Sequence, residues 1–346
     1  MAELTTYFSG MKGRALCSAL FLGMTTTPAV FAAEKETTPP KGEDTITVRA
    51  DASSADQAVT SGYQPLSSST ATLTSMPLLD IPQVVNTVSD KVLEDQHVTT
   101  LDEALYNVSN VVQTNTLGGT QDAFVRRGFG ANRDGSVMTN GLKTVLPRSF
   151  NAATSRVEVL KGPASTLYGI LDPGGLINVV TKRPETQFGG SISVTSSSFG
   201  GGTGQFDVTG PIEGTQLAYR LIGEYQHEDY WRNFGTYQSS FISPSLTWFG
   251  DKATVNVLYS HRDYKAPFDR GTIFDLNTKH AVNVDRKTRF DEPFNITDGE
   301  SDLAQLNAEY RFNSEWTAKF DYSFSQDKYS DNQARVMAYD SASGNL

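Results

Sequence analysis

The chain has a single cysteine, Cys17, only four histidines and no long apolar run. One cysteine cannot form an internal disulfide and cannot build a cysteine-based metal site. The histidines do not have the spacing of metal ligands, so we expect no haem, no free metal site and no resident cofactor. An excess of acidic side chains gives a formal net charge of −10, which makes the chain a poor nucleic-acid binder.

Motifs for enzymatic chemistry are also missing. The sequence contains no Gly-x-Ser-x-Gly pattern, which a nucleophilic hydrolase would carry. The stretch "KGPASTLYG" (161–169) has glycines but lacks the Gly-Lys-Ser/Thr ending of a phosphate-binding loop. The sequence therefore gives no support for an enzyme.

The first 33 residues predict an export signal. Lys12 and Arg14 supply the positive end, the run Ala15–Met24 supplies the apolar core, and "AVFAA", which ends at Ala33, supplies a small-residue cleavage site. The alternative is a membrane anchor, but this run is far shorter than the roughly 20 residues that a spanning helix needs. We therefore expect an exported protein with residues 1–33 removed.

The mature chain divides by composition into three parts. Residues 34–75 are rich in Pro, Thr, Ser and Ala and predict a tether, which contains one isolated strand-like stretch, "DTITVRA" (44–50). Residues 76–185 predict a compact α/β domain. Its expected elements are a strand in "IPQVVNTVS", a helix over 90–96, a helix that begins at the capping box Thr100/Glu103, and strands in "VEVLKG" and "GGLINVVTKRP".

Residues 186–346 alternate between apolar and polar side chains. The clearest case is 316–325, where Trp, Ala, Phe, Tyr and Phe alternate with Thr, Lys, Asp, Ser and Ser. Short turns such as "FGDK" and "FNSE" alternate with longer connections such as 264–301, and aromatic residues cluster at the short-turn end. This pattern favours a transmembrane antiparallel β-barrel with lipid outside. The alternative is a soluble antiparallel sandwich, which also alternates.

Three stretches resemble segments of the TonB-dependent outer-membrane receptors, most closely the ferric-siderophore group. "DTITVRA" (44–50) is similar to the TonB box, and "AFVRRGFG" (123–130) is similar to the Arg-Gly segment of the plug domain. "RVEVLKGPASTLYGILDPGGLINVVTKRP" (156–184) is similar to the closing signature of the plug, and this match is long and specific. The TonB box alone would be weak evidence.

The resemblance implies a mixed α/β plug inside a transmembrane antiparallel β-barrel of 22 strands, of which residues 186–346 encode about seven. It implies active transport of a ferric siderophore across the bacterial outer membrane. The implied partners are outer-membrane lipid and TonB with its inner-membrane energising complex, and bacteriocins and phages stay open as outside ligands. Haem, cobalamin or saccharide uptake remain alternatives, as does a non-transporting fragment that only binds TonB.

The resemblance also suggests site residues. TonB would bind the box by adding it as a strand to an exposed sheet edge, through Asp44, Thr45, Ile46, Thr47, Val48, Arg49 and Ala50. Arg126 and Arg127 are expected on one strand, with one side chain toward the barrel wall and the other toward the plug interior. Candidate ligand contacts on outward loops are Arg133, Arg148, Phe150, Tyr230 and Trp231, since arginine suits an anionic chelate and aromatic rings offer contact area.

Both ends of the sequence raise a question. The ten residues before Met11 fit no signal pattern, so Met11 is a candidate for the true start, and the choice between Met1 and Met11 stays open. An odd number of strands does not close a bacterial barrel, and open strand edges are untenable in lipid. The sequence therefore predicts the N-terminal part of a longer receptor.

Overall fold

The plug contains a five-stranded mixed sheet. The computed structural model describes residues 62–63, 65–130 and 135–345. The plug strands run in the order β3-β8-β9-β6-β7, with β6 and β9 parallel and the other neighbours antiparallel. Their bounds are β3 Val84–Val88, β6 Val137–Thr139, β7 Leu142–Lys143, β8 Thr154–Lys161 and β9 Gly175–Thr181. Strands β3, β8 and β9 confirm the sequence-based expectation.

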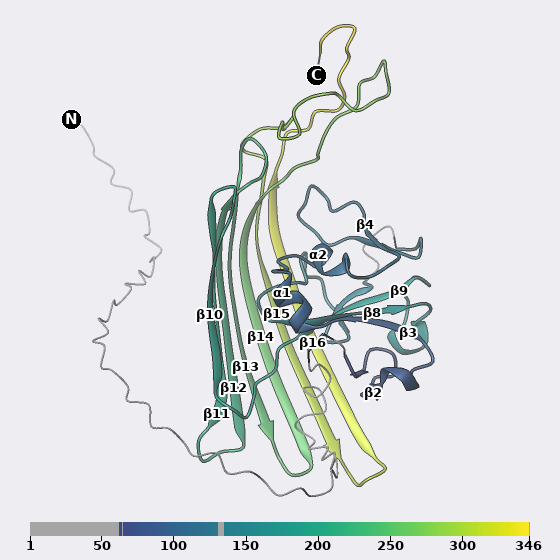
Figure 1. Cartoon of the computed structure of the whole chain (residues 1–346), viewed down its shortest axis with the longest axis vertical. Coiled ribbons are helices and arrows are strands. Elements are labelled where there is room, and N and C mark those ends of the chain that lie inside the picture. The colour runs from purple at the N-terminus through teal and green to yellow at the C-terminus, as the bar shows by residue number, and fades with distance from the viewer. Residues whose placement is uncertain (1–61, 64, 131–134, 346) are drawn as a thin grey trace, which may run out of the picture. The chain divides into compact units, whose positions relative to one another are not determined.

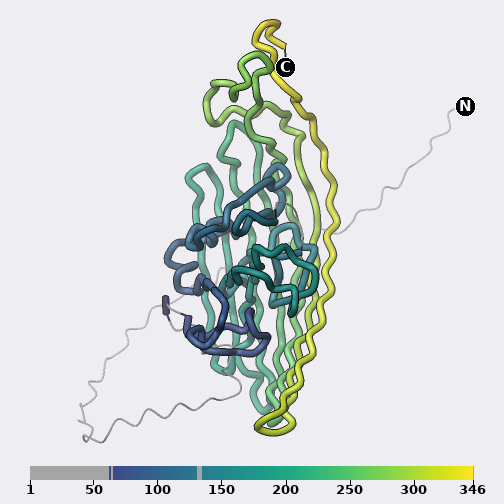
Figure 2. The backbone as a smooth tube through the Cα atoms, turned by 90° about the vertical axis from the view of Figure 1, so that its right-hand side faces the viewer, coloured from purple at the N-terminus to yellow at the C-terminus, as the bar shows by residue number. Residues whose placement is uncertain are grey.

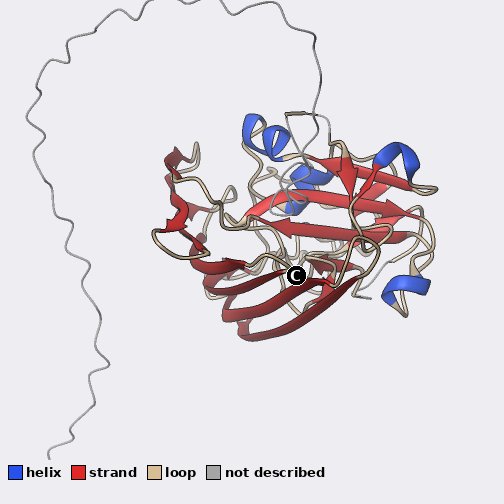
Figure 3. Ribbon diagram, turned by 90° about the horizontal axis from the view of Figure 1, so that it is seen from below, coloured by secondary structure: helices blue, strands red, loops and turns tan. Residues whose placement is uncertain are grey.

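Short helices cover this sheet (Figures 1 and 3). Their bounds are η1 Leu78–Asp80, α1 Asp90–Asp95, α2 Leu101–Leu105 and α3 Ser165–Tyr168. Helix α2 begins where the capping box predicted, because the Glu103 carboxylate accepts hydrogen bonds from the backbone N–H groups of Thr99 (2.8 Å) and Thr100 (3.2 Å). Among the described residues, no helix is both long and apolar enough to cross a bilayer.

Apolar side chains from α1, α2, β8 and β9 form the main core of the plug. Leu101, Ala104, Val157 and Ile177 are at most 1% exposed and pack in one cluster. Burying a Leu, Val or Ile side chain contributes about 1.5–3 kcal/mol, which offsets the ordering cost of these short elements. The core therefore explains why the plug folds around helices too short to be stable alone.

The plug begins earlier than the composition suggested. Ser68 and Thr70 were expected in the tether, yet both are buried and both donate hydrogen bonds to the buried carboxylate of Glu158. Arg156 donates to the other carboxylate oxygen at 2.6 Å. The expected tether end at residue 75 is therefore wrong, because these polar residues serve as partners for a buried charge. The short strands β1 Ser67–Ser68 and β2 Met76–Pro77 pair within this segment.

Another small antiparallel pair joins β4 Val111–Gln113 and β5 Phe124–Arg126. Strand β5 ends at Arg126, and Arg127 follows in the left-handed region with φ +49°. The expectation that both arginines lie on one strand with opposite faces is therefore wrong. The tight turn that follows contains two positive-φ glycines, Gly128 and Gly130, and it ends the strand between Arg126 and Arg127.

Residues 189–332 form a seven-stranded antiparallel meander within the described chain, each strand pairing with the next (Figure 1). The strands are β10 Gly189–Ser196, β11 Gly201–Ile212, β12 Leu217–Asp229, β13 Thr236–Phe249, β14 Ala253–Pro267, β15 Ile296–Arg311 and β16 Thr317–Asn332. The number matches the sequence estimate. Turns at one end are short, and the 268–295 connection extends from the other end, as expected.

The two faces of the meander differ in chemistry, as the alternation predicted. One face exposes Leu221, Val257, Phe320, Tyr322 and Phe324. The opposite face, here called the inner face, carries polar residues such as Asp207, Ser239 and Gln305, which are buried beneath the plug. Figures 2 and 3 show the plug lying along this face of the curved sheet.

Specific contacts attach the plug to the inner face. Gln305 Nε2 donates to the carbonyl of Thr139 at 3.0 Å, and the backbone N–H of Val145 donates to Ser325 Oγ at 3.0 Å. A small apolar cluster joins Ala152 and Ala153 of the plug to the sheet. Its sheet residues, Ile222 and Phe241, point inward against the general polar pattern. These two apolar positions mark where the sheet contacts protein instead of water.

Candidate functional site

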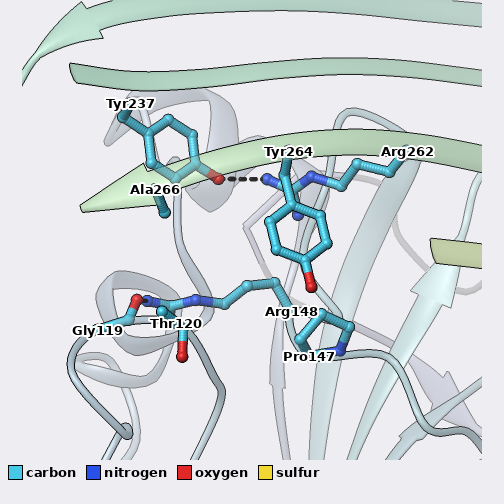
Figure 4. A pocket seen from close by; sticks show the side chains of 8 residues that line it. All are labelled: Gly119, Thr120, Pro147, Arg148, Tyr237, Arg262, Tyr264 and Ala266. Carbon is cyan, nitrogen blue, oxygen red and sulfur yellow. Dashed lines mark hydrogen bonds between the residues drawn. The ribbon is translucent and has the colours of Figure 1, made fainter. Parts of the chain in front are cut away.

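A small hollow with an accessible volume of about 10 Å³, partly open to solvent, lies between the plug and the long-loop end of the inner face (Figure 4). We call it the plug–sheet hollow. Its plug side is formed by Gly119, Thr120, Pro147 and Arg148, and its sheet side by Tyr237, Arg262, Tyr264 and Ala266. Positions 262, 264 and 266 share one face of β14, because side chains alternate along a strand.

Arg262 is fixed by two neutral groups. Its Nη2 donates to the Tyr237 hydroxyl at 2.6 Å and its Nε donates to Ser239 Oγ at 2.9 Å. Both partners come from β13, the neighbouring strand. The register of the sheet therefore presents this guanidinium to the hollow. Sequence reasoning did not select Arg262, although its inward position close to a long connection was readable.

Arg148, a predicted ligand contact, also lines the hollow but carries a charged partner. Its Nη1 lies 3.2 Å from Asp122 Oδ1, and its Nη2 donates to the carbonyl of Gly119. Asp122 also accepts from the backbone N–H of Ser149 at 2.7 Å. Burial raises the pKa of Asp122 above its usual value, although the Arg148 charge opposes this shift. Asp122 thus ties two plug loops together beneath the hollow.

Tyr230, a second predicted contact, is engaged in a cluster of outer-loop residues. Its hydroxyl donates to Asp269 Oδ2 at 2.9 Å, and the Arg232 guanidinium pairs with the other carboxylate oxygen at 3.3 Å. Burial and the Asp269 charge raise the pKa of Tyr230 to about 12. Trp231 lies within cation–π distance of Arg232 (4.9 Å) and Arg286 (5.8 Å). Both aromatic residues therefore organise the loops.

The 268–295 connection contacts the plug directly. The backbone N–H of Asp269 donates to the carbonyl of Gly118 at 3.0 Å, and the fully buried Phe268 ring lies against Gly118. Gly118 has φ +69°, and a Cβ built there would come within 2.9 Å of the ring. A glycine is required by both backbone conformation and space. The outer loop and the plug loop 115–121 are therefore held in register beside the hollow.

The other predicted site residues have varied placements. Phe150 is half-buried against the main plug core, so packing already accounts for it. Arg126 is 2% exposed and donates to the plug carbonyls of Gly175 and Phe124, both at 3.1 Å. Arg127 is exposed. Arg133 and the whole box 44–50 lie outside the described residues, so their roles stay predictions.

The structure places a plug–sheet ion network where the sequence proposed none. Lys182, just after β9, donates to Asp207 Oδ2 of β11 at 3.0 Å. Arg220 of β12 binds both Asp207 oxygens at 2.8 and 2.7 Å and also donates to the carbonyl of Arg183 at 2.9 Å. Among the described residues, no cluster of side chains could hold a metal ion.

Comparison with known proteins agrees with this arrangement. The family model of the TonB-dependent receptor plug domain matches residues 77–176. The chain is 30% identical over 297 residues to the metal-pseudopaline receptor CntO of Pseudomonas aeruginosa, covering 84% of this chain and 41% of that protein. It is 31% identical over 224 residues to the ferrioxamine receptor of Yersinia enterocolitica, and the match covers 62% of this chain and 31% of that protein.

Among solved structures, the ferric-catecholate import receptor Fiu of E. coli, in its closed form, superposes with a TM-score of 0.67 at 26% identity, over 77% of this chain and 40% of that one. The chain thus spans well under half the length of these relatives. The similarity covers both the plug and the meander, and TonB-dependent receptors are proteins of the outer membrane. The chain belongs to the TonB-dependent receptor family and carries its plug domain together with strands of its outer-membrane barrel.

Proposed function

We propose that the protein takes part in TonB-dependent uptake of a ferric siderophore or related metal chelate across the outer membrane. The observation that carries this proposal is the plug seated on the polar face of a sheet whose other face is apolar. Such a sheet suits lipid on one side and a filled lumen on the other. The receptor names of the relatives support a chelate as substrate.

In the proposed mechanism, the chelate binds at the long-loop end, where the plug–sheet hollow and the outer-loop cluster lie. TonB then engages residues 44–50 and pulls the plug away from the inner face. The plug–sheet contacts are individually modest, since hydrogen bonds contribute about 0.5–1.5 kcal/mol net and charged ones about 1.5–3 kcal/mol. A mechanical pull can break them in sequence. Energy comes through TonB, and no bound nucleotide or resident cofactor is required.

Uptake of iron-55 chelates by iron-limited cells of the source bacterium tests this proposal. Four strains are compared: wild type, a deletion of this gene, a deletion of TonB, and the gene deletion complemented in trans. We expect at least one ferric chelate whose uptake is lost in both deletions and restored by the complementing gene. Uptake that persists without TonB would overturn the transport mechanism. Surface binding without any uptake would favour a protein that binds chelate and TonB but does not transport.

A further inference from the structure

The plug sheet has a second covered face, opposite the main core. Because side chains alternate along a strand, Leu160 of β8 and Leu176 of β9 point away from α1 and α2. This face is covered by the segment 65–77, which contains β1 and β2 and which we call the strap. Its Ala71 is 5% exposed within the same apolar cluster, and Met76 packs against that cluster. The strap thus closes the second core of the plug.

Polar anchors hold the strap on this face. The hydroxyls of Ser68 and Thr70 donate to one oxygen of the Glu158 carboxylate at 2.6 and 2.5 Å. Asn178, opposite Glu158 on β9, donates to Thr70 Oγ1 at 2.9 Å. Hydrogen bonds to a charged group are roughly twice as strong as neutral ones, and Glu158 is fully buried. The strap is therefore attached through a few strong bonds at one place.

The strap is a hairpin whose open end receives the pull. Strands β1 and β2 contain two residues each, and beside them the backbone N–H of Leu78 donates to the carbonyl of Leu66 at 3.1 Å. The chain from residues 44–50 enters at Leu66, whereas Leu78 leads into the plug. A pull on one end of a hairpin that is held at the other loads the hydrogen bonds one at a time. Figures 1 and 2 show the strap at the end of the plug nearest the short turns, which is the periplasmic side in the proposed function.

The attachment of the plug to the sheet is loaded later. Lys182 donates to Asp207 at the C-terminal end of the plug, where the chain continues into β10. A pull that enters at Leu66 therefore reaches the strap before it reaches this ion network. Just upstream, the Tyr63 hydroxyl donates to the Asp95 carboxylate, but this contact is exposed and water competes for both groups. The strap is thus the first buried contact in line with the pull.

We propose that residues 65–77 form a detachable strap, anchored on Glu158, which TonB removes from the plug before the plug leaves the sheet. The inference rests on the proposed function for the pull, and it goes further by naming the first part that moves. Detachment removes two donors from the Glu158 carboxylate and uncovers Leu160 and Leu176. The second core of the plug then opens while Lys182 still holds the plug to the sheet.

Hydrogen exchange of the purified protein in detergent tests the strap without TonB. The amide of Leu78, bonded across the open end of the hairpin, reports the strap. The amide of Ile177, which makes a backbone hydrogen bond of 2.8 Å, reports β9. The test variant is Thr70→Val, which removes an anchor. The matched control is Thr72→Val, whose hydroxyl donates only to a carbonyl in the exposed turn of the strap.

We expect Leu78 to exchange faster than Ile177 in the wild type, and Thr70→Val to speed exchange at Leu78 by roughly 10- to 100-fold. Exchange at Ile177 should change by less than about threefold, and Thr72→Val should change neither amide. Equal acceleration at Leu78 and Ile177 would show a single cooperative unit and would overturn the inference. So would equal exchange rates at Leu78 in the two variants.

Single cysteines report the order of opening in cells, because the only cysteine of the sequence lies within the expected export signal. Ala71→Cys lies beneath the strap, and Ala153→Cys lies in the apolar cluster between plug and sheet; the two alanines are 5% and 2% exposed. Iron-limited cells that import the iron-55 chelate identified in the uptake experiment receive a brief pulse of a hydrophilic maleimide small enough to pass porins. The extent of modification is measured by mass spectrometry in strains with and without TonB.

We expect TonB to speed modification of the Ala71→Cys protein by about tenfold or more, and to affect the Ala153→Cys protein less. Faster modification of Ala153→Cys would mean that the plug leaves the sheet with its strap in place, and would overturn the inference. So would modification of Ala71→Cys that is independent of TonB in cells whose uptake requires TonB. Uptake that needs no TonB would overturn the proposed function, and the exchange rates at Leu78 would then decide on the strap by themselves.

Discussion

Replacing Asp207 by Asn should loosen the end of the plug from the sheet. Asp207 is 4% exposed and accepts two hydrogen bonds from Arg220 and one from Lys182 of the plug. The amide keeps the shape but removes the charge and one acceptor. Breaking a fully buried ion pair costs about 3–5 kcal/mol. Because the Lys182 side chain is 25% exposed and Glu185 still pairs with Arg220, we expect Asp207→Asn to weaken the attachment of the plug to the sheet by about 2 kcal/mol.

A cost of about 2 kcal/mol corresponds to a roughly 30-fold rise in the local opening equilibrium. Hydrogen exchange of the purified protein in detergent measures this opening at the backbone amide of Glu185, which donates to Thr209 Oγ1 at 2.8 Å. The matched control is Asp321→Asn, since Asp321 lies on the inner face of β16 and accepts a single hydrogen bond from Asn307. A change below threefold at Glu185, or faster exchange confined to β11 and β12, would refute the reasoning.

Three further outcomes follow from the described contacts. Gly118→Ala should clash with the Phe268 ring and strain a left-handed residue, which costs about 1 kcal/mol or more and exposes the 268–295 connection to protease. Gly119→Ala has open space at its Cβ and should cost only the backbone strain. Equal protease sensitivity of the two variants would contradict the docking of this connection on the plug. Tyr322→Arg, in the apolar band of β16, should lower the free energy of unfolding in lipid bilayers by about 2–4 kcal/mol. Ser330→Arg, on the same face nearer the long-loop end, should lower it by at most about 1 kcal/mol. If urea titrations found Ser330→Arg to be the more destabilising of the two, the lipid-facing assignment would be disproved. Burial raises the pKa of Asp122, so the folded loop binds more protons than the unfolded chain just above the usual carboxyl range. Protection of residues 115–122 from hydrogen exchange should therefore fall as pH rises from about 4. Asp122→Asn should remove this pH dependence of protection, and the same pH dependence in the variant as in the wild type would reject the assignment.

The sequence predicted the sheet well because its two faces meet different solvents. Along 316–325 the alternation of aromatic and polar residues follows from lipid on one side and polar surroundings on the other, and the structure reproduces it in β16. The plug strands β8 and β9 were equally readable, since both are rich in Val, Leu and Ile and their ends are marked by Gly or Pro. Local capping chemistry placed α2 within a residue.

The sequence predicted less where a residue's role depends on a distant partner. Ser68 and Thr70 look like linker residues until Glu158 is placed beneath them. Arg127 was assigned to a strand because alternation does not reveal a left-handed residue that ends it. Phe150 and Tyr230 have the chemistry of ligand contacts, yet one packs on the core and the other holds Asp269.

Arg262 shows the opposite error, a site residue that was overlooked. It lies in "YSHRDYKAP", where the charged neighbours are outward and Arg262 alone faces the plug beside Tyr264. Only the strand register shows that its partners are Tyr237 and Ser239 and that neither carries a charge. Counting inward positions near long connections would have selected it.

The ratio of uptake to surface binding for an Ile46→Pro protein tests the central claim most directly. Proline removes a backbone N–H and cannot extend a partner's sheet, so TonB should fail to grip residues 44–50 while the outer surface stays intact. With the chelate identified in the uptake experiment, we expect binding equal to wild type and uptake below about one tenth of it in the same cells. Wild-type uptake by the Ile46→Pro protein would contradict the account.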